Sequence, residues 1–224
     1  MKRALLIIIY WCSAFLSIDV LLLTAVNNEG KELELSLHAS FVNVFLLLTA
    51  SSFLRLITIR PGFLPKPTIS VDFSDLSKNL STKSSWVVCK SCSIFTSPTA
   101  RHCTTCNGCL VRSRGHWSAM CTCVGVLNHK FLIQLLFWGV VFSTYTLCVG
   151  LKLTTNCASV ICCGLSLSSL LILAYFLYKE VMFVTRAEEG VHVTLLRIFG
   201  RGNKLFWLFP CSSSVSSKPN IADM

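Results

Sequence analysis

Charged residues are scarce in this sequence. Only 13% of its 224 residues are charged, whereas 53% are hydrophobic, and the mean hydropathy is +0.66. A typical soluble domain carries about 25% charged residues. The scarcity of charge therefore excludes an ordinary soluble domain and predicts a membrane protein.

A basic surface interleaved with aromatic residues, which is typical of nucleic-acid-binding proteins, is also missing. The formal net charge of +10 arises from 20 basic and 10 acidic residues. The basic residues lie in the loops between apolar segments, as they do in membrane proteins. We therefore predict membrane lipid as the surroundings of the chain and no nucleic-acid partner.

The apolar segments predict four membrane-spanning helices, because one crossing needs about 20 residues. The predicted spans are residues 4–26, 35–59, 130–151 and 157–178. The first span contains Asp19 and follows Met1-Lys2-Arg3, a basic start that is also found in cleaved signal peptides. No small-residue cleavage site follows a short apolar core there, which favours a span.

Two of the segments outside the spans are predicted to face the cytosol, and the two short loops that carry Lys31 and Lys152 lie on the other side. The two cytosolic segments are a linker and Cys-rich domain at residues 60–129, with its core at 89–128, and a tail at 179–224. Residues 60–130 hold nine basic and two acidic residues, and the tail holds six and four. The positive-inside rule therefore places both termini and the Cys-rich domain in the cytosol.

The Cys-rich domain has the residues and the spacing of a metal-binding segment. Residues 89–131 hold seven of the thirteen cysteines and three of the five histidines. Leaving His129 aside, these residues are Cys89, Cys92, His102, Cys103, Cys106, Cys109, His116, Cys121 and Cys123. A Cys-x2-Cys pair brings two sulfurs to one ion, and zinc takes four sulfur or nitrogen ligands. The set is large enough for two zinc sites.

Two other interpretations of these cysteines are open. A disulfide framework needs an oxidising compartment, whereas cytosolic thiols stay reduced. Unrelated buried thiols would not keep so regular a spacing. The predicted topology and the spacing both favour metal binding.

The spans and the Cys-rich domain between the second and third of them resemble the DHHC family of protein S-acyltransferases (palmitoyltransferases). The family pattern C-x2-C-x9-H-C-x2-C-x2-C-x4-DHHC-x5-C-x4-N keeps its spacing here from Cys89 to Asn128, and Phe131 follows. Weaker similarities flank it, namely Arg60-Pro61-Gly62, Thr185-x-x-Glu188, Ile198-Phe199-Gly200, Trp207 and Pro210. The resemblance implies an all-α membrane protein with four transmembrane helices and a zinc-bound domain between the second and third.

The resemblance also implies two zinc sites of three cysteines and one histidine each. Carried over by position, the first set is Cys89, Cys92, His102 and Cys109. The second set is Cys103, Cys106, His116 and Cys123. All eight residues are present.

The residues that would carry the family's chemistry are missing. In that family the signature cysteine takes an acyl group from a long-chain acyl-CoA and passes it to a protein cysteine, while the adjacent His and Asp activate the thiol. Here Arg114, Gly115 and Trp117 stand at the Asp, His and Cys positions, and only His116 remains. An indole forms no thioester, so this chemistry at residue 117 is excluded.

Cys121 is the one cysteine of the segment outside the two sets, and it is a candidate surrogate thiol. It lies four residues beyond the missing nucleophile, with no His or carboxylate beside it in the sequence. The alternatives are a passive thiol or a substitute ligand for Cys123.

Three functions are consistent with these residues. The first is a catalytically degenerate family member that binds acyl lipid, a client protein or an active relative. The second is an active S-palmitoyltransferase that uses palmitoyl-CoA, either through Cys121 or by holding the acyl-CoA for a substrate thiol. The third is a metal or redox sensor. The resemblance implies an endomembrane location, in the ER or Golgi.

Overall fold

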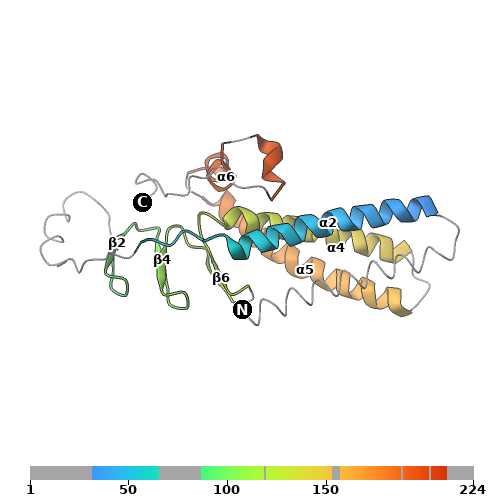
Figure 1. Cartoon of the computed structure of the whole chain (residues 1–224), viewed down its shortest axis with the longest axis horizontal. Helices are drawn as coiled ribbons and strands as arrows, with labels where there is room; N and C mark the ends of the chain where they lie inside the picture. Colours follow the sequence, from blue (N-terminus) through green and yellow to red (C-terminus); the bar gives the residue numbers. More distant parts are fainter. Residues whose placement is uncertain are drawn as a thin grey trace, which may run out of the picture.

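The structure, a computed structural model, describes residues 32–65, 87–118, 120–152, 157–187, 189–201 and 203–210. The first predicted span, residues 4–26, lies outside the described residues, as does Glu188. Three long helices run along the long axis of the molecule, and short strands lie beyond one end of them (Figure 1).

The three helices are α2 (Glu32–Thr58), α4 (His129–Lys152) and α5 (Cys157–Thr185). Helix α4 contacts both of the others. The segments Ser36–Thr58, His129–Lys152 and Val160–Thr185 are long and apolar enough to cross a membrane. Large apolar side chains on their outer faces are exposed, for example Leu47 at 68% and Leu171 at 63%. Such a surface suits hydrocarbon surroundings.

Helix α5 continues beyond Tyr178, where the sequence analysis ended the fourth span. The prediction stopped at the charged pair Lys179-Glu180, but the helix runs on to Thr185. It can do so because the Glu180 side chain is buried with charged partners and Val184 packs against Ile198 and Phe199.

The Cys-rich domain is built of β-hairpins, so the prediction of an all-α protein omits this part of the fold. Its strands are β1 (Val87–Cys89), β2 (Ile94–Thr96), β3 (Arg101–Cys103), β4 (Gly108–Leu110), β5 (Gly115–Trp117) and β6 (Thr122–Val124). They pair antiparallel as β1–β2, β3–β4 and β5–β6. The first hairpin lies farthest from the long helices, and the third lies next to them (Figure 1).

The three hairpins are structural repeats. They begin at residues 87, 101 and 115, a period of 14, and each has strands of three residues. The last turn residue has positive φ in every case, with values of 52° at Ser93, 50° at Asn107 and 50° at Cys121. The same turn conformation therefore closes all three hairpins.

The helical tail elements lie against α4 and the end of α5. They are α6 (Val191–Phe199) and the 3-10 helix η1 (Lys204–Trp207). Gln134 Nε2 of α4 donates to the carbonyl oxygens of Trp207 and Phe209, both at 2.7 Å. Trp138 Nε1 donates to the carbonyl of Leu208 at 2.8 Å. The segment after α6 is thus fixed along the helix surface.

Asn128 joins the Cys-rich domain to the helices. Its side-chain oxygen accepts from the Gly125 amide at 2.9 Å, and its side-chain nitrogen donates to the carbonyls of Cys123 at 2.9 Å and Leu56 at 3.3 Å. The side chain is fully buried. One residue therefore links β6, the first turn of α4 and the end of α2.

Gly125 gives a test of this junction. A Cβ at this position would overlap the carbonyl oxygen of Pro61 and lie 2.9 Å from Leu110 Cδ2. We expect Gly125→Ala to lower the free energy of unfolding by about 2 kcal/mol, because backbone must move to make room. The thermal midpoint of the detergent-solubilised protein measures the loss.

Gly164→Ala in α5 is the matched control, because nothing lies within 4 Å of its added Cβ. It should leave the midpoint unchanged or raise it. Equal midpoints for the two variants would contradict the tight junction.

Candidate metal centres and the signature segment

The first candidate metal centre joins the first two hairpins. Cys89 ends β1 and Cys92 lies in the following turn, while His102 and Cys109 are directly opposite each other in the β3–β4 ladder. The four ligand atoms lie within 4.8 Å of one another. His102 Nδ1 lies 3.2 Å from Cys92 Sγ and 3.7 Å from Cys109 Sγ.

The second candidate centre repeats this arrangement one hairpin further along. Cys103 ends β3 and Cys106 lies in its turn, while His116 and Cys123 are paired in the β5–β6 ladder. These four ligand atoms also lie within 4.8 Å of one another. His116 Nδ1 is 3.3 Å from Cys106 Sγ and 3.5 Å from Cys123 Sγ.

The eight residues thus meet in the two groups of four that the sequence analysis proposed, and both groups fit zinc. In a tetrahedron with bonds of about 2.3 Å to sulfur and 2.0 Å to nitrogen, ligand atoms lie about 3.6 Å apart. The distances between sulfur and nitrogen in the two groups range from 3.2 to 3.9 Å. None of the ten cysteines whose side chains the structure describes forms a disulfide.

The thiols of each group cannot all ionise without a cation. Burial and the neighbouring thiols raise the pKa of the Cys109 thiol to about 12. The same causes raise the pKa of the Cys123 thiol. Burial also opposes ionisation of Cys103, but hydrogen bonds from the Cys106 amide and from Cys123 outweigh it and lower the pKa of the Cys103 thiol. A divalent ion would replace the remaining protons, so metal affinity should fall as the pH falls.

The third hairpin carries apolar residues where the other two carry their Cys-x2-Cys pairs. Trp117 ends β5 as Cys89 ends β1 and Cys103 ends β3. Trp117 and Met120 pack against the apolar cluster formed by the ends of the long helices. The Trp117 ring lies 5.0 Å from the Phe176 ring of α5, measured between centroids. The indole at the nucleophile position is therefore a packing residue.

Arg114, at the family's Asp position, forms a buried ion pair that sequence reasoning missed. Its Nη2 lies 2.8 Å from Glu180 Oε1, and its Nε lies 3.1 Å from Glu180 Oε2. His129 Nε2 lies 2.9 Å from the same Oε2. The Glu180 side chain is only 4% exposed, and the Arg114 guanidinium lies 3.8 Å from the Phe183 ring centroid. The sequence feature that could have indicated this pair is Glu180, an acidic residue just beyond the predicted end of the fourth span.

The two other candidate residues have no activating partners. Gly115, at the family's base position, has φ of +106° and nothing within 4 Å of where a Cβ would be. Cys121 is exposed, and its thiol donates to the Ser118 carbonyl at 3.5 Å. Within the part of the chain that the structure describes, the Cys121 thiol has no hydrogen bond to a histidine or carboxylate. It belongs to neither group of four ligands.

Comparison with known proteins gives one family. The family model described as DHHC palmitoyltransferase matches residues 82–190. The chain is 39% identical over 75 residues to palmitoyltransferase PFA3 of Debaryomyces hansenii, which covers 33% of this chain and 18% of that protein. It is 26% identical over 189 residues to palmitoyltransferase ERF2 of Kluyveromyces lactis, which covers 72% and 51%. The chain thus spans about half the length of these relatives or less.

The metal centres predict which cysteine is needed for zinc. We expect the purified protein to bind about two zinc ions per chain and Cys123→Ser to bind about one, since four ligands close each structural site. Cys121→Ser, two residues away, is the matched control and should keep both ions. Elemental analysis of zinc per protein measures this. If Cys121→Ser lost a zinc ion and Cys123→Ser kept both, Cys121 would be the ligand in place of Cys123.

The buried ion pair predicts a large cost when Arg114 is removed. Arg114→Ala leaves Glu180 buried with a single partner, which should lower the free energy of unfolding by about 3 kcal/mol or more. The control is Arg112→Ala, because Arg112 pairs with the more exposed Glu189 and such pairs contribute about 0–1 kcal/mol. The fraction of each variant that stays monodisperse after heating reports the difference. Equal losses would contradict a special role for the Arg114 pair.

Proposed function

Since residues 82–190 carry a domain of the DHHC palmitoyltransferase family, we propose that this protein is a member that keeps the metal scaffold and has lost thioester catalysis. One observation carries this proposal. The residue at the nucleophile position is Trp117, whose ring packs on Phe176 within the apolar cluster. An indole cannot form a thioester, and Gly115 at the base position cannot take a proton.

The metal scaffold is proposed to hold two structural zinc ions. Each set of three cysteines and one histidine leaves no open position for water, so a zinc ion bound there stabilises the fold and carries no reaction. The excess of basic residues in the segments flanking the spans supports a cytosolic position for the Cys-rich domain. Membership of this family supports an endomembrane location, in the ER or Golgi.

A pocket beside Trp117 supports binding of an acyl lipid or acyl-CoA. It has a volume of about 780 Å³, and its wall includes the aromatic rings of Trp117, Phe176 and Phe183. Lys179 and Arg186 also line it. An apolar wall with cations at its rim matches an amphiphile with an anionic head group. The protein would then bind the family's acyl ligand without reacting with it, alone or beside an active relative and its client proteins.

Residual S-acylation through Cys121 is the alternative. Cys121 lies on the exposed turn of the third hairpin and does not line this pocket. Efficient nucleophilic attack by a thiol needs an activating base beside it, and the Cys121 thiol has no hydrogen bond to a histidine or carboxylate among the described residues. The geometry therefore favours binding over transfer.

Labelling with a palmitate analogue separates the two functions. We expect wild-type protein and Cys121→Ser to carry the same label after hydroxylamine treatment, because no thioester turns over at either residue 117 or residue 121. The ERF2 palmitoyltransferase of Kluyveromyces lactis, labelled in parallel, is the positive control. Hydroxylamine-sensitive label that disappears in Cys121→Ser would show that Cys121 forms an acyl thioester and would overturn the proposal.

A further inference from the structure

A second pocket, next to the one beside Trp117, is lined by basic residues. It has a volume of about 520 Å³ and lies between the second hairpin, the segment leading to the third, the end of α5 and α6. Its charged lining residues are Arg101, Arg112, Arg186, Arg197 and Glu189. Among the lining residues that the structure describes, four guanidinium groups face one carboxylate, which leaves a surplus of positive charge. His129 also lines this pocket, but its imidazole contacts Glu180.

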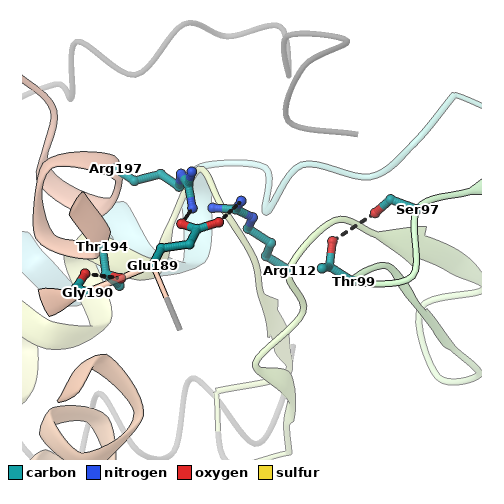
Figure 2. Close-up of polar contacts among 7 residues, drawn as sticks. All are labelled: Ser97, Thr99, Arg112, Glu189, Gly190, Thr194 and Arg197. Atoms are coloured by element: carbon teal, nitrogen blue, oxygen red, sulfur yellow. Dashed lines mark hydrogen bonds and ion pairs between the residues drawn. The ribbon is translucent and has the colours of Figure 1, made fainter. Parts of the chain in front are cut away.

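Glu189 already shows how these arginines bind an anion. Arg112 Nη2 lies 3.4 Å from Glu189 Oε1, and Arg197 Nη1 contacts Glu189 Oε2. Figure 2 shows the two guanidinium groups reaching the carboxylate from opposite sides, that of Arg112 from the Cys-rich domain and that of Arg197 from α6. The Glu189 side chain is 46% exposed. The carboxylate therefore bridges two elements at the mouth of the pocket and remains open to competition by another anion.

The other two arginines are available to a ligand. Arg101 and Arg186 are exposed, and neither forms an ion pair with any residue that the structure describes. Thr99 also lines the pocket. Its hydroxyl lies 2.8 Å from that of Ser97, as Figure 2 shows. Guanidinium groups form paired hydrogen bonds with phosphate oxygens, and a hydroxyl can add one more.

The position of the pocket indicates where its ligand comes from. Arg186 directly follows Thr185, the last residue of one candidate span, and His129 is the first residue of another. Both residues line the pocket. The pocket therefore opens at the level where two helices leave the membrane, which is the level of the lipid head groups.

We infer that this pocket binds the phosphomonoester head group of a membrane lipid on the side of the bilayer that carries the Cys-rich domain, with Glu189 as an internal competitor. A phosphomonoester carries about −1.5 to −2 charges at pH 7, more than a carboxylate or a phosphodiester. It is the anion that best matches a surplus of arginines. The inference requires neither the loss of thioester catalysis nor an acyl ligand in the pocket beside Trp117.

Binding of short-chain lipids to the zinc-loaded full chain in detergent tests the inference. The probes are dioctanoyl phosphatidic acid, a phosphomonoester, and dioctanoyl phosphatidylglycerol, a phosphodiester. Glycerol 3-phosphate is the same head group without acyl chains. We expect phosphatidic acid to bind at least about fivefold more tightly than phosphatidylglycerol or glycerol 3-phosphate. Equal binding of the two lipids would overturn the inference. If glycerol 3-phosphate binds as tightly as phosphatidic acid, the ligand is a free phosphomonoester and not a membrane lipid.

Charge-neutralising variants locate the site. We expect the double variant Arg101→Gln, Arg186→Gln to bind phosphatidic acid about tenfold more weakly. Arg201→Gln, an exposed arginine outside the pocket, is the matched control and should bind as wild type does. Unchanged affinity in the double variant would overturn the inference.

Glu189→Gln gives an independent outcome of opposite sign. Removing the internal competitor should tighten the binding of phosphatidic acid several-fold, because a negative charge leaves the pocket and Arg112 loses its carboxylate partner. The zinc content of each variant reports whether its fold is kept. If the double arginine variant loses zinc, Glu189→Gln still decides, since it removes no cation. Weaker binding in Glu189→Gln would contradict the proposed competition.

Discussion

Two groups of four metal ligands constrain the rest of this structure. Each hairpin has strands of only three residues, and a two-stranded hairpin of that size is unstable alone in water. The middle hairpin gives His102 and Cys109 to one group and Cys103 and Cys106 to the other. A metal ion in each group would therefore link all three hairpins, and its binding free energy would become folding free energy of the domain.

The residues at the positions of the family's catalytic set have structural partners of their own. Arg114 is paired with the buried Glu180 and lies over Phe183. Trp117 packs with Phe176 and, together with Met120, fills the positions that hold the Cys-x2-Cys pairs in the other two hairpins. The third hairpin thus docks on the helices through apolar contacts and one ion pair. The docking of this hairpin therefore needs no cysteine at residue 117.

Local spacing predicted metal binding, and the resemblance to a known family predicted the two sets of ligands, but contacts between distant residues could not be predicted. The eight Cys and His residues follow a pattern that a single sequence displays, and the long apolar runs predicted three of the described helices. The hairpin repeat was not predicted, although Cys103, His116 and Cys123 follow Cys89, His102 and Cys109 at the same interval. By contrast, Arg114 and Glu180 are 66 residues apart, and no local pattern joins them. The extension of α5 depended on that pair and was missed for the same reason.

The central claim is that each group of four ligands holds one zinc ion through three sulfurs and one nitrogen. X-ray absorption at the zinc edge of the purified full chain tests this most directly. The account predicts an average shell of three sulfurs at about 2.3 Å and one nitrogen at about 2.0 Å per zinc. A shell dominated by oxygen, or one with two sulfurs and two nitrogens, would contradict it.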